Sequence, residues 1–284
     1  VQLAKRLGVP CTITMRGTES RLAKDKVLGP LMARALCSAD RVFAVSSSLQ
    51  SVALSLGVPA HKVEVVGNGV DIETFFPEPA AASRERFGVA QDAPVLITVG
   101  GLVERKGFHR VMRCLPELRK SHPGLQYLVV GGPSPEGDMT EALHLLRQQL
   151  GLQDCVHFLG ALKPNELRHA LSAANVFALS TRNEGWANVL LEAMACGLPV
   201  VTTDVGGNRE VVCSGDVGTV VPFDDEHALC SALDTALRAP WDRAAIRRYA
   251  QANTWDKRVL QLSENFLSLA RANRSRERFS EVRP

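Results

Sequence analysis

The sequence predicts an α/β protein built from doubly wound parallel sheets, the first only partly present. Short β-branched runs alternate with helical patterns along most of the chain, which is typical of βαβ units. A stretch rich in proline and alanine, residues 75–94, separates two series of such units and is expected to be a linker with a short helix. The length of 284 residues accommodates two domains, and 45% hydrophobic with 22% charged residues is a globular composition.

The first domain, residues 1–74, is expected to contain three strands. They are the β-branched runs at 11–15, 41–45 and 62–66. Helical patterns between them lie near 29–39 and 48–56. Because residues 1–7 read as the end of a helix before Gly8-Val9-Pro10, we take the chain as a fragment that lacks the beginning of this domain.

The second domain, residues 95–254, is expected to be a complete doubly wound unit. Its six predicted strands are 95–99, 126–130, 156–159, 176–179, 199–203 and 217–221. Its predicted helices are 108–121, 140–150, 165–173, 187–196 and 227–237. After it, residues 255–284 are expected to form an amphipathic helix over 255–270 and a charged tail.

Composition and missing motifs exclude several classes of protein. Lys and Arg exceed Asp and Glu by only 33 to 30, which is too small a surplus for a general nucleic-acid binder. The seven cysteines form no Cys-x-x-Cys pair, and no histidines pair at metal-ligand spacing, so we expect reduced thiols, no metal site and a cytoplasmic protein. The glycine motifs of dehydrogenases, P-loop NTPases and serine hydrolases are also missing.

The most informative segment runs from Asn183 to Pro199. It follows a predicted strand, begins a helix after Glu184, and ends that helix at Gly197. Ligands of doubly wound folds bind outside the carboxyl ends of the strands, where the first amides of this helix would favour a phosphate. Glu184 and Glu192 would then flank the phosphate, and each carboxylate can accept from a vicinal diol of a sugar. The alternative is an ordinary helix start with two solvated glutamates.

A second strand–turn–helix segment carries adjacent cations. Val99-Gly100-Gly101 leads into Glu104-Arg105-Lys106-Gly107, at the carboxyl end of the first strand of the second domain. Arg105 and Lys106 could neutralise a diphosphate there. The alternative is a solvated charged turn, since most charge runs are exposed.

These motifs together resemble those of the family 4 (group 1) glycosyltransferases. The resemblance rests on Glu184 to Glu192, which fits the family's Glu-x7-Glu pattern, on the following residues to Val201, on 65–71 and on Arg105-Lys106-Gly107. It covers nearly everything from Cys11 to about Trp255. It implies a GT-B architecture of two Rossmann-like domains that face each other across a cleft.

The resemblance also implies an activity and roles for individual residues. A retaining, metal-independent transferase would move a sugar from a nucleotide-diphosphate-sugar donor to an acceptor hydroxyl, without a cofactor, in cell-envelope or exopolysaccharide synthesis. Glu184 would hold the donor sugar, Lys106 and Arg105 would act on the diphosphate, and Glu192 would bind the ribose. The remaining donor contacts would come from Trp186, Ala187, Asn188, Val189, Leu162 and Lys163.

Two positions depart from the family pattern. Gly101 stands where many members have an arginine, so Arg105 would have to substitute for it. Arg16 stands where a histidine is common, and a guanidinium cannot act as a base, so it would bind phosphate or a charged acceptor. The expected partners are a nucleotide sugar and a sugar or lipid-linked acceptor, with peripheral membrane contact and no nucleic acid. A sugar-nucleotide epimerase of the same fold and a donor-binding fragment without turnover are the alternative functions.

Overall fold

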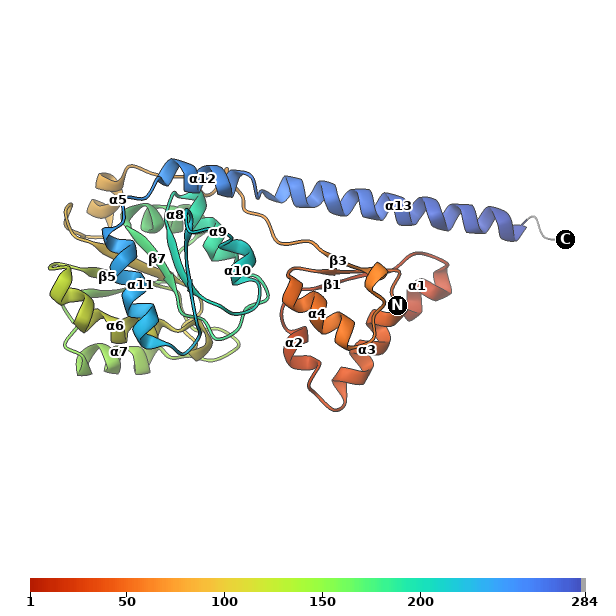
Figure 1. The fold of residues 1–284 in the computed structure, drawn as a ribbon, viewed down its shortest axis with the longest axis horizontal. Helices are drawn as coiled ribbons and strands as arrows, with labels where there is room; N and C mark the ends of the chain where they lie inside the picture. Colours follow the sequence, from red (N-terminus) through yellow and green to blue (C-terminus); the bar gives the residue numbers. More distant parts are fainter. Residues whose placement is uncertain (282–284) are drawn as a thin grey trace. The chain divides into compact units, whose positions relative to one another are not determined.

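A computed structural model describes the backbone of residues 1–281 and the side chains of residues 1–273. The chain divides into two compact units, one formed by residues 1–69 with 255–284 and one by residues 70–254 (Figure 1). The expected fold class is confirmed, since each unit contains a parallel sheet. The range 75–94, expected to be a linker with a short helix, contains such a helix and belongs to the second unit. There Arg84 of α5 (Ala80–Arg86) is buried and donates to the carbonyl of Ala173 and the side chain of Asn175.

The first unit is a three-stranded sheet in the order β1-β2-β3. Its strands are β1 (Thr12–Met15), β2 (Arg41–Ala44) and β3 (Val63–Val65). Its helices before residue 70 are α1 (Gln2–Leu7), α2 (Glu19–Leu22), α3 (Leu28–Ser38) and α4 (Ser47–Ser55), with a 3-10 turn η1 (Ala60–Lys62). All three strands match the predicted ones within one or two residues.

The last helix, α13 (Trp255–Glu281), belongs to this first unit and contacts its strands β2 and β3. The ring of Phe266 meets that of Phe43 edge-on at 5.8 Å, and Gln261 donates to Glu64. The helix therefore continues well past the expected end at Ala270. Residues 282–284 of the expected tail lie outside the described residues.

The second unit contains all six predicted strands in the order β6-β5-β4-β7-β8-β9, every pair parallel. They are β4 (Val95–Val99), β5 (Gln126–Val130), β6 (Val156–Gly160), β7 (Val176–Leu179), β8 (Val200–Thr203) and β9 (Gly218–Val221). The chain builds the sheet outward from β4 in one direction, returns to pair β7 with β4, and continues in the other direction. The carboxyl ends of β4 and β7 are thus the topological switch point, where doubly wound folds bind ligands.

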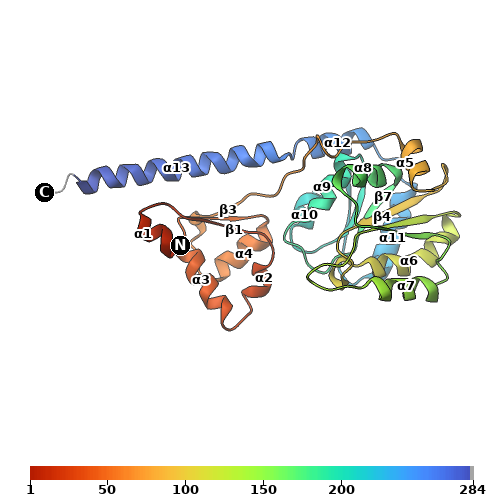
Figure 2. The same cartoon turned by 180° about the vertical axis from the view of Figure 1, so that it is seen from behind.

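Helices cover both faces of this sheet because its strands alternate side chains between two cores (Figures 1 and 2). One core includes Ile97 and Phe177 with residues of α8 (Pro164–Ala173), α9 (Asn188–Ala195) and α12 (Arg243–Gln251). The other includes Leu96 and Val176 with residues of α6 (Phe108–Ser121), α7 (Thr140–Gln149) and α11 (Glu226–Arg238). A 3-10 turn η2 (Glu104–Lys106) and the short α10 (Asn208–Val211) complete the unit.

Candidate functional site

The loops that follow β4 and β7 touch at the switch point. Gly107 approaches Ser180 so closely that a Cβ atom at Gly107 would stand 1.8 Å from the Ser180 carbonyl oxygen. Its φ of +76° is also one that glycine adopts without strain. Beside this contact, the Arg182 N–H donates to the Arg105 carbonyl oxygen at 2.8 Å. The glycine turn predicted in the sequence therefore permits two charged loops to lie backbone to backbone.

Three predicted residues, Lys106, Arg105 and Glu184, meet at this junction. Glu184 Oε1 lies 2.6 Å from Lys106 Nζ and 3.0 Å from Arg105 Nη1. The Thr181 hydroxyl donates to the same oxygen at 3.1 Å. The Glu184 side chain is only 9% exposed, so its charge is shielded from water and held by two cations. The alternative interpretation, in which these three side chains are solvated, does not agree with their burial and pairing.

Arg105 has a second carboxylate partner that the sequence analysis missed. Its Nε and Nη2 donate to the two oxygens of Glu136, at 2.8 and 2.9 Å. The hydrogen bonds to Glu136 raise the pKa of the Arg105 guanidinium, which burial opposes and the nearby Glu184 reinforces. Glu136 comes from the loop after β5 and is exposed, so no hydrophobic periodicity marks it in the sequence.

Helix α9 begins beside this cluster, as the spacing predicted. Its first residue is Asn188, one later than expected, and the preceding Ala187 has no polar side chain to cap the first amides. The first amides of a helix have no acceptor within the helix, and its dipole favours an anion there. Val189 follows in the first turn, and the donor contacts expected of these residues stay a prediction.

Glu192 lies one turn into α9 and is partly buried. Burial raises its pKa to about 7, and the positive charge of Lys106 acts in the opposite direction. Lys106 is therefore near enough to influence both glutamates of the motif. Glu192 is thus not the solvent-facing residue of the alternative interpretation. Its expected contact with ribose stays a prediction.

The other predicted residues lie around this centre or apart from it. Trp186 packs against the core beside α9, and its indole Nε1 is buried without a hydrogen-bond partner. Leu162 and Lys163 follow β6, at the same edge of the sheet but two strands from β4. Arg16 belongs to the other unit, where it follows β1 and is exposed. Its backbone N–H donates to Glu19, and its expected role in binding an anion stays a prediction.

The comparisons with known proteins name the family. Residues 80–253 match the model of glycosyl transferases group 1, and residues 1–74 match that of glycosyltransferase family 4. The chain belongs to the group 1 glycosyltransferases. The resemblance seen in its motifs is thereby confirmed.

Two relatives are named for different acceptors. The chain is 36% identical over 240 residues to a GDP-mannose-dependent α-(1-6)-phosphatidylinositol monomannoside mannosyltransferase of Mycolicibacterium smegmatis, covering 80% of this chain and 62% of that protein. It is 37% identical over 190 residues to a D-inositol 3-phosphate glycosyltransferase of Frankia alni, covering 65% of this chain and 47% of that one. The chain therefore spans about half to two thirds of the length of these relatives.

Solved structures confirm the GT-B fold of this group 1 glycosyltransferase. Sucrose-phosphate synthase of Thermosynechococcus elongatus matches with a TM-score of 0.81 and 27% identity, over 95% of this chain and 70% of that one. The Anabaena protein Alr3699/HepE, solved with UDP and glucose, matches with a TM-score of 0.82 and 25% identity, over 93% and 73%. Within the described residues, no group of three or more acidic, His or Cys side chains could hold a metal ion. A search of those same residues for a helix that could span a bilayer finds none.

Proposed function

We propose that this glycosyltransferase moves a hexose from a nucleoside-diphosphate donor to an acceptor hydroxyl with retention of the anomeric configuration. The observation that carries the proposal is the pairing of Glu184 with Lys106 and Arg105 at the switch point. The names of two relatives support the donor class, because one uses GDP-mannose and another was solved with UDP and glucose. At this edge of the sheet, a carboxylate is then available to the sugar of the donor and two cations to its diphosphate.

The three contacts of Glu184 orient its carboxylate for a sugar. All of them use Oε1, so among the described contacts Oε2 is left to accept a hydroxyl of the donor sugar. Lys106 and Arg105, fixed on the neighbouring loop, would face the diphosphate. When the anomeric bond breaks, negative charge grows on the departing phosphate, and these cations with the start of α9 stabilise it. Charge stabilisation by side chains and amides makes a metal ion dispensable in this scheme.

The acceptor belongs to the same proposal. Two relatives are named for inositol-containing acceptors, which favours a polyol or a lipid-linked sugar in envelope or exopolysaccharide synthesis. A cytoplasmic location fits the seven cysteines, all of them free thiols in the structure.

Substitution of the paired charges tests the proposal. With a panel of nucleotide sugars, we expect Glu184→Gln and Lys106→Ala each to lower turnover by about 10²-fold or more, the scale seen when a preorganised charge contact is removed. Glu117→Gln and Lys120→Ala are matched controls, because these residues form an exposed ion pair on α6. Turnover in both site variants equal to that of the parent would overturn the assignment.

The same assay separates the remaining alternatives. Isomeric nucleotide sugars formed without an acceptor would identify an epimerase. The anomeric configuration of the product, read by NMR, decides retention, and unchanged turnover in a chelator such as EDTA is expected for a metal-independent enzyme.

A further inference from the structure

Arg110, in the first turn of α6, contacts both loops of the candidate site. It is not among the site residues predicted from the sequence. Its Nη1 donates to the Ser180 carbonyl oxygen at 2.8 Å, in the loop after β7. Its Nη2 lies 2.5 Å from Glu104 Oε1, in the loop after β4. One guanidinium therefore spans the junction at which Lys106 and Glu184 meet.

The loop partners of Arg110 stand directly beside the charged cluster. Glu104 begins the 3-10 turn that carries Arg105 and Lys106, and Ser180 is four residues before Glu184.

The other oxygen of Glu104 lies 3.1 Å from Arg182 Nη2, so Glu104 is an anion between two arginines on different elements. The Arg110 pair is the better shielded of the two, with Arg110 13% exposed and Arg182 59% exposed, so water screens it less.

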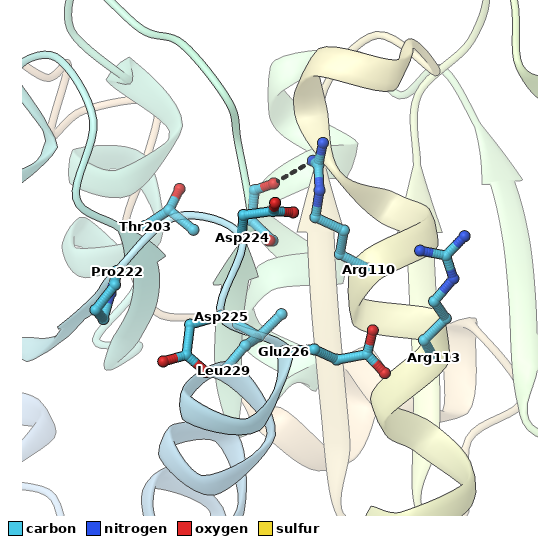
Figure 3. Close-up of a pocket in the computed structure, with 9 residues that line it drawn as sticks. Arg110, Arg113, Thr203, Pro222, Asp224, Asp225, Glu226 and Leu229 are labelled. Carbon is cyan, nitrogen blue, oxygen red and sulfur yellow. Dashed lines mark hydrogen bonds between the residues drawn. The ribbon is translucent and has the colours of Figure 1, made fainter.

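The surroundings hold the Arg110 side chain in place. Its guanidinium carbon lies 4.9 Å from the centre of the Phe223 ring, in the loop after β9. Arg110 lines a small pocket of about 80 Å³. Figure 3 shows its side chain next to Asp224, with a hydrogen bond toward the β7 loop. Arg113, one turn later on α6, lines the same pocket and forms neither of these two bonds.

We propose that Arg110 is a positioning residue, which fixes Lys106 and Glu184 relative to each other by joining Glu104 to Ser180 across the two loops. The planar fork of a guanidinium reaches two acceptors at once, which the single ammonium group of lysine cannot do in the same geometry. Without it, the buried Ser180 carbonyl loses a donor and Glu104 loses its shielded counter-ion. The proposal rests on the proposed function for its catalytic consequence, but the restraint of the loops exists without substrate.

Hydrogen exchange in the ligand-free protein tests the restraint directly. For Arg110→Met we expect amides in residues 104–107 and 180–189 to exchange at least tenfold faster, while those of α12, on the other face of the sheet, stay unchanged. Arg113→Met is the matched control and should leave both loops as in the parent. Parent-like exchange in Arg110→Met, or acceleration spread evenly over the second unit, would overturn the proposal. Should Arg110→Met fail to fold, Arg110→Lys replaces it, with the same localised acceleration expected.

Turnover provides the second measurement. We expect Arg110→Met to lower kcat about 10- to 100-fold while the donor KM changes less than threefold, and added guanidinium ions to restore part of the loss. A change in KM alone, or no rescue, would count against positioning. If the parent turns over no nucleotide sugar, the proposed function fails, and the exchange measurement still decides the role of Arg110.

Discussion

Glu184 illustrates how one carboxylate can be both held and available. Three donors converge on its Oε1, two of them cationic, so its orientation is set before any ligand arrives. A diphosphate bound at the same place would share Lys106 and Arg105 with it. Folding therefore orients these groups before a ligand binds, and such preorganisation is the general condition for electrostatic catalysis.

The raised pKa of Glu192 predicts how the stability of the protein depends on pH. Its folded pKa of about 7 lies above the ordinary value of 4.5, so the folded state retains a proton that the unfolded chain releases. Stability from this group is fully present below about pH 4.5 and is lost as pH rises through 7. Relative to Glu192→Gln, the parent should lose about 3 kcal/mol of unfolding free energy between pH 4.5 and 8, at 1.36 kcal/mol per unit of pKa.

Urea unfolding of the two proteins across this range measures the difference. Glu117→Gln, an exposed substitution on α6, is the control and should parallel the parent. A constant difference between parent and Glu192→Gln would show that Glu192 is ionised with an ordinary pKa.

At the level of the elements, glycine sets how closely the site loops approach. Gly107 and Gly124 have similar φ angles of +76° and +80°, but a Cβ would meet Ser180 only at Gly107 and open space at Gly124. Gly124→Ala should cost about 1 kcal/mol, the strain of the left-handed conformation. Gly107→Ala should cost at least about 2 kcal/mol more, because backbone must move. Denaturant unfolding compares them, and equal costs would refute the close-approach argument.

Most helices and strands could be predicted from the sequence, whereas the contacts between side chains could not. The strands from β1 to β9 and the start of α9 follow from β-branched runs, glycine turns and capping signals, which are local. Helix α12 was missed, although Ile246 and Ala250 stand four residues apart on its buried face. Glu104, Arg110 and Glu136 were also missed, since their partners lie on loops that only the tertiary fold brings together. Residues 75–94, expected to be a linker with a short helix, do contain such a helix, but its contacts through Arg84 with Ala173 of α8 and with Asn175 could not be predicted.

The two units of the molecule differ in charge. Residues 1–69 with 255–284 contain 16 Lys and Arg against 8 Asp and Glu, whereas residues 70–254 contain 17 against 22. The near-neutral total therefore hides a basic unit and an acidic one. The cations of the candidate site lie in the acidic unit, which emphasises that their placement at the switch point, not net charge, favours an anionic ligand.

The second unit contains everything that the donor half of the proposal requires. Both large hydrophobic cores lie entirely within residues 70–254, as do Lys106, Glu184 and Glu192. We therefore expect residues 70–254 alone to unfold in one cooperative transition and to bind UDP or GDP by calorimetry within about threefold of the affinity of the whole chain. Lys106→Ala in the excised unit should weaken that binding at least tenfold, and Lys120→Ala should not. A folded unit that gives no heat with either nucleotide at millimolar concentration would place the nucleotide contacts elsewhere, whereas failure to fold would show that the two units depend on each other for stability.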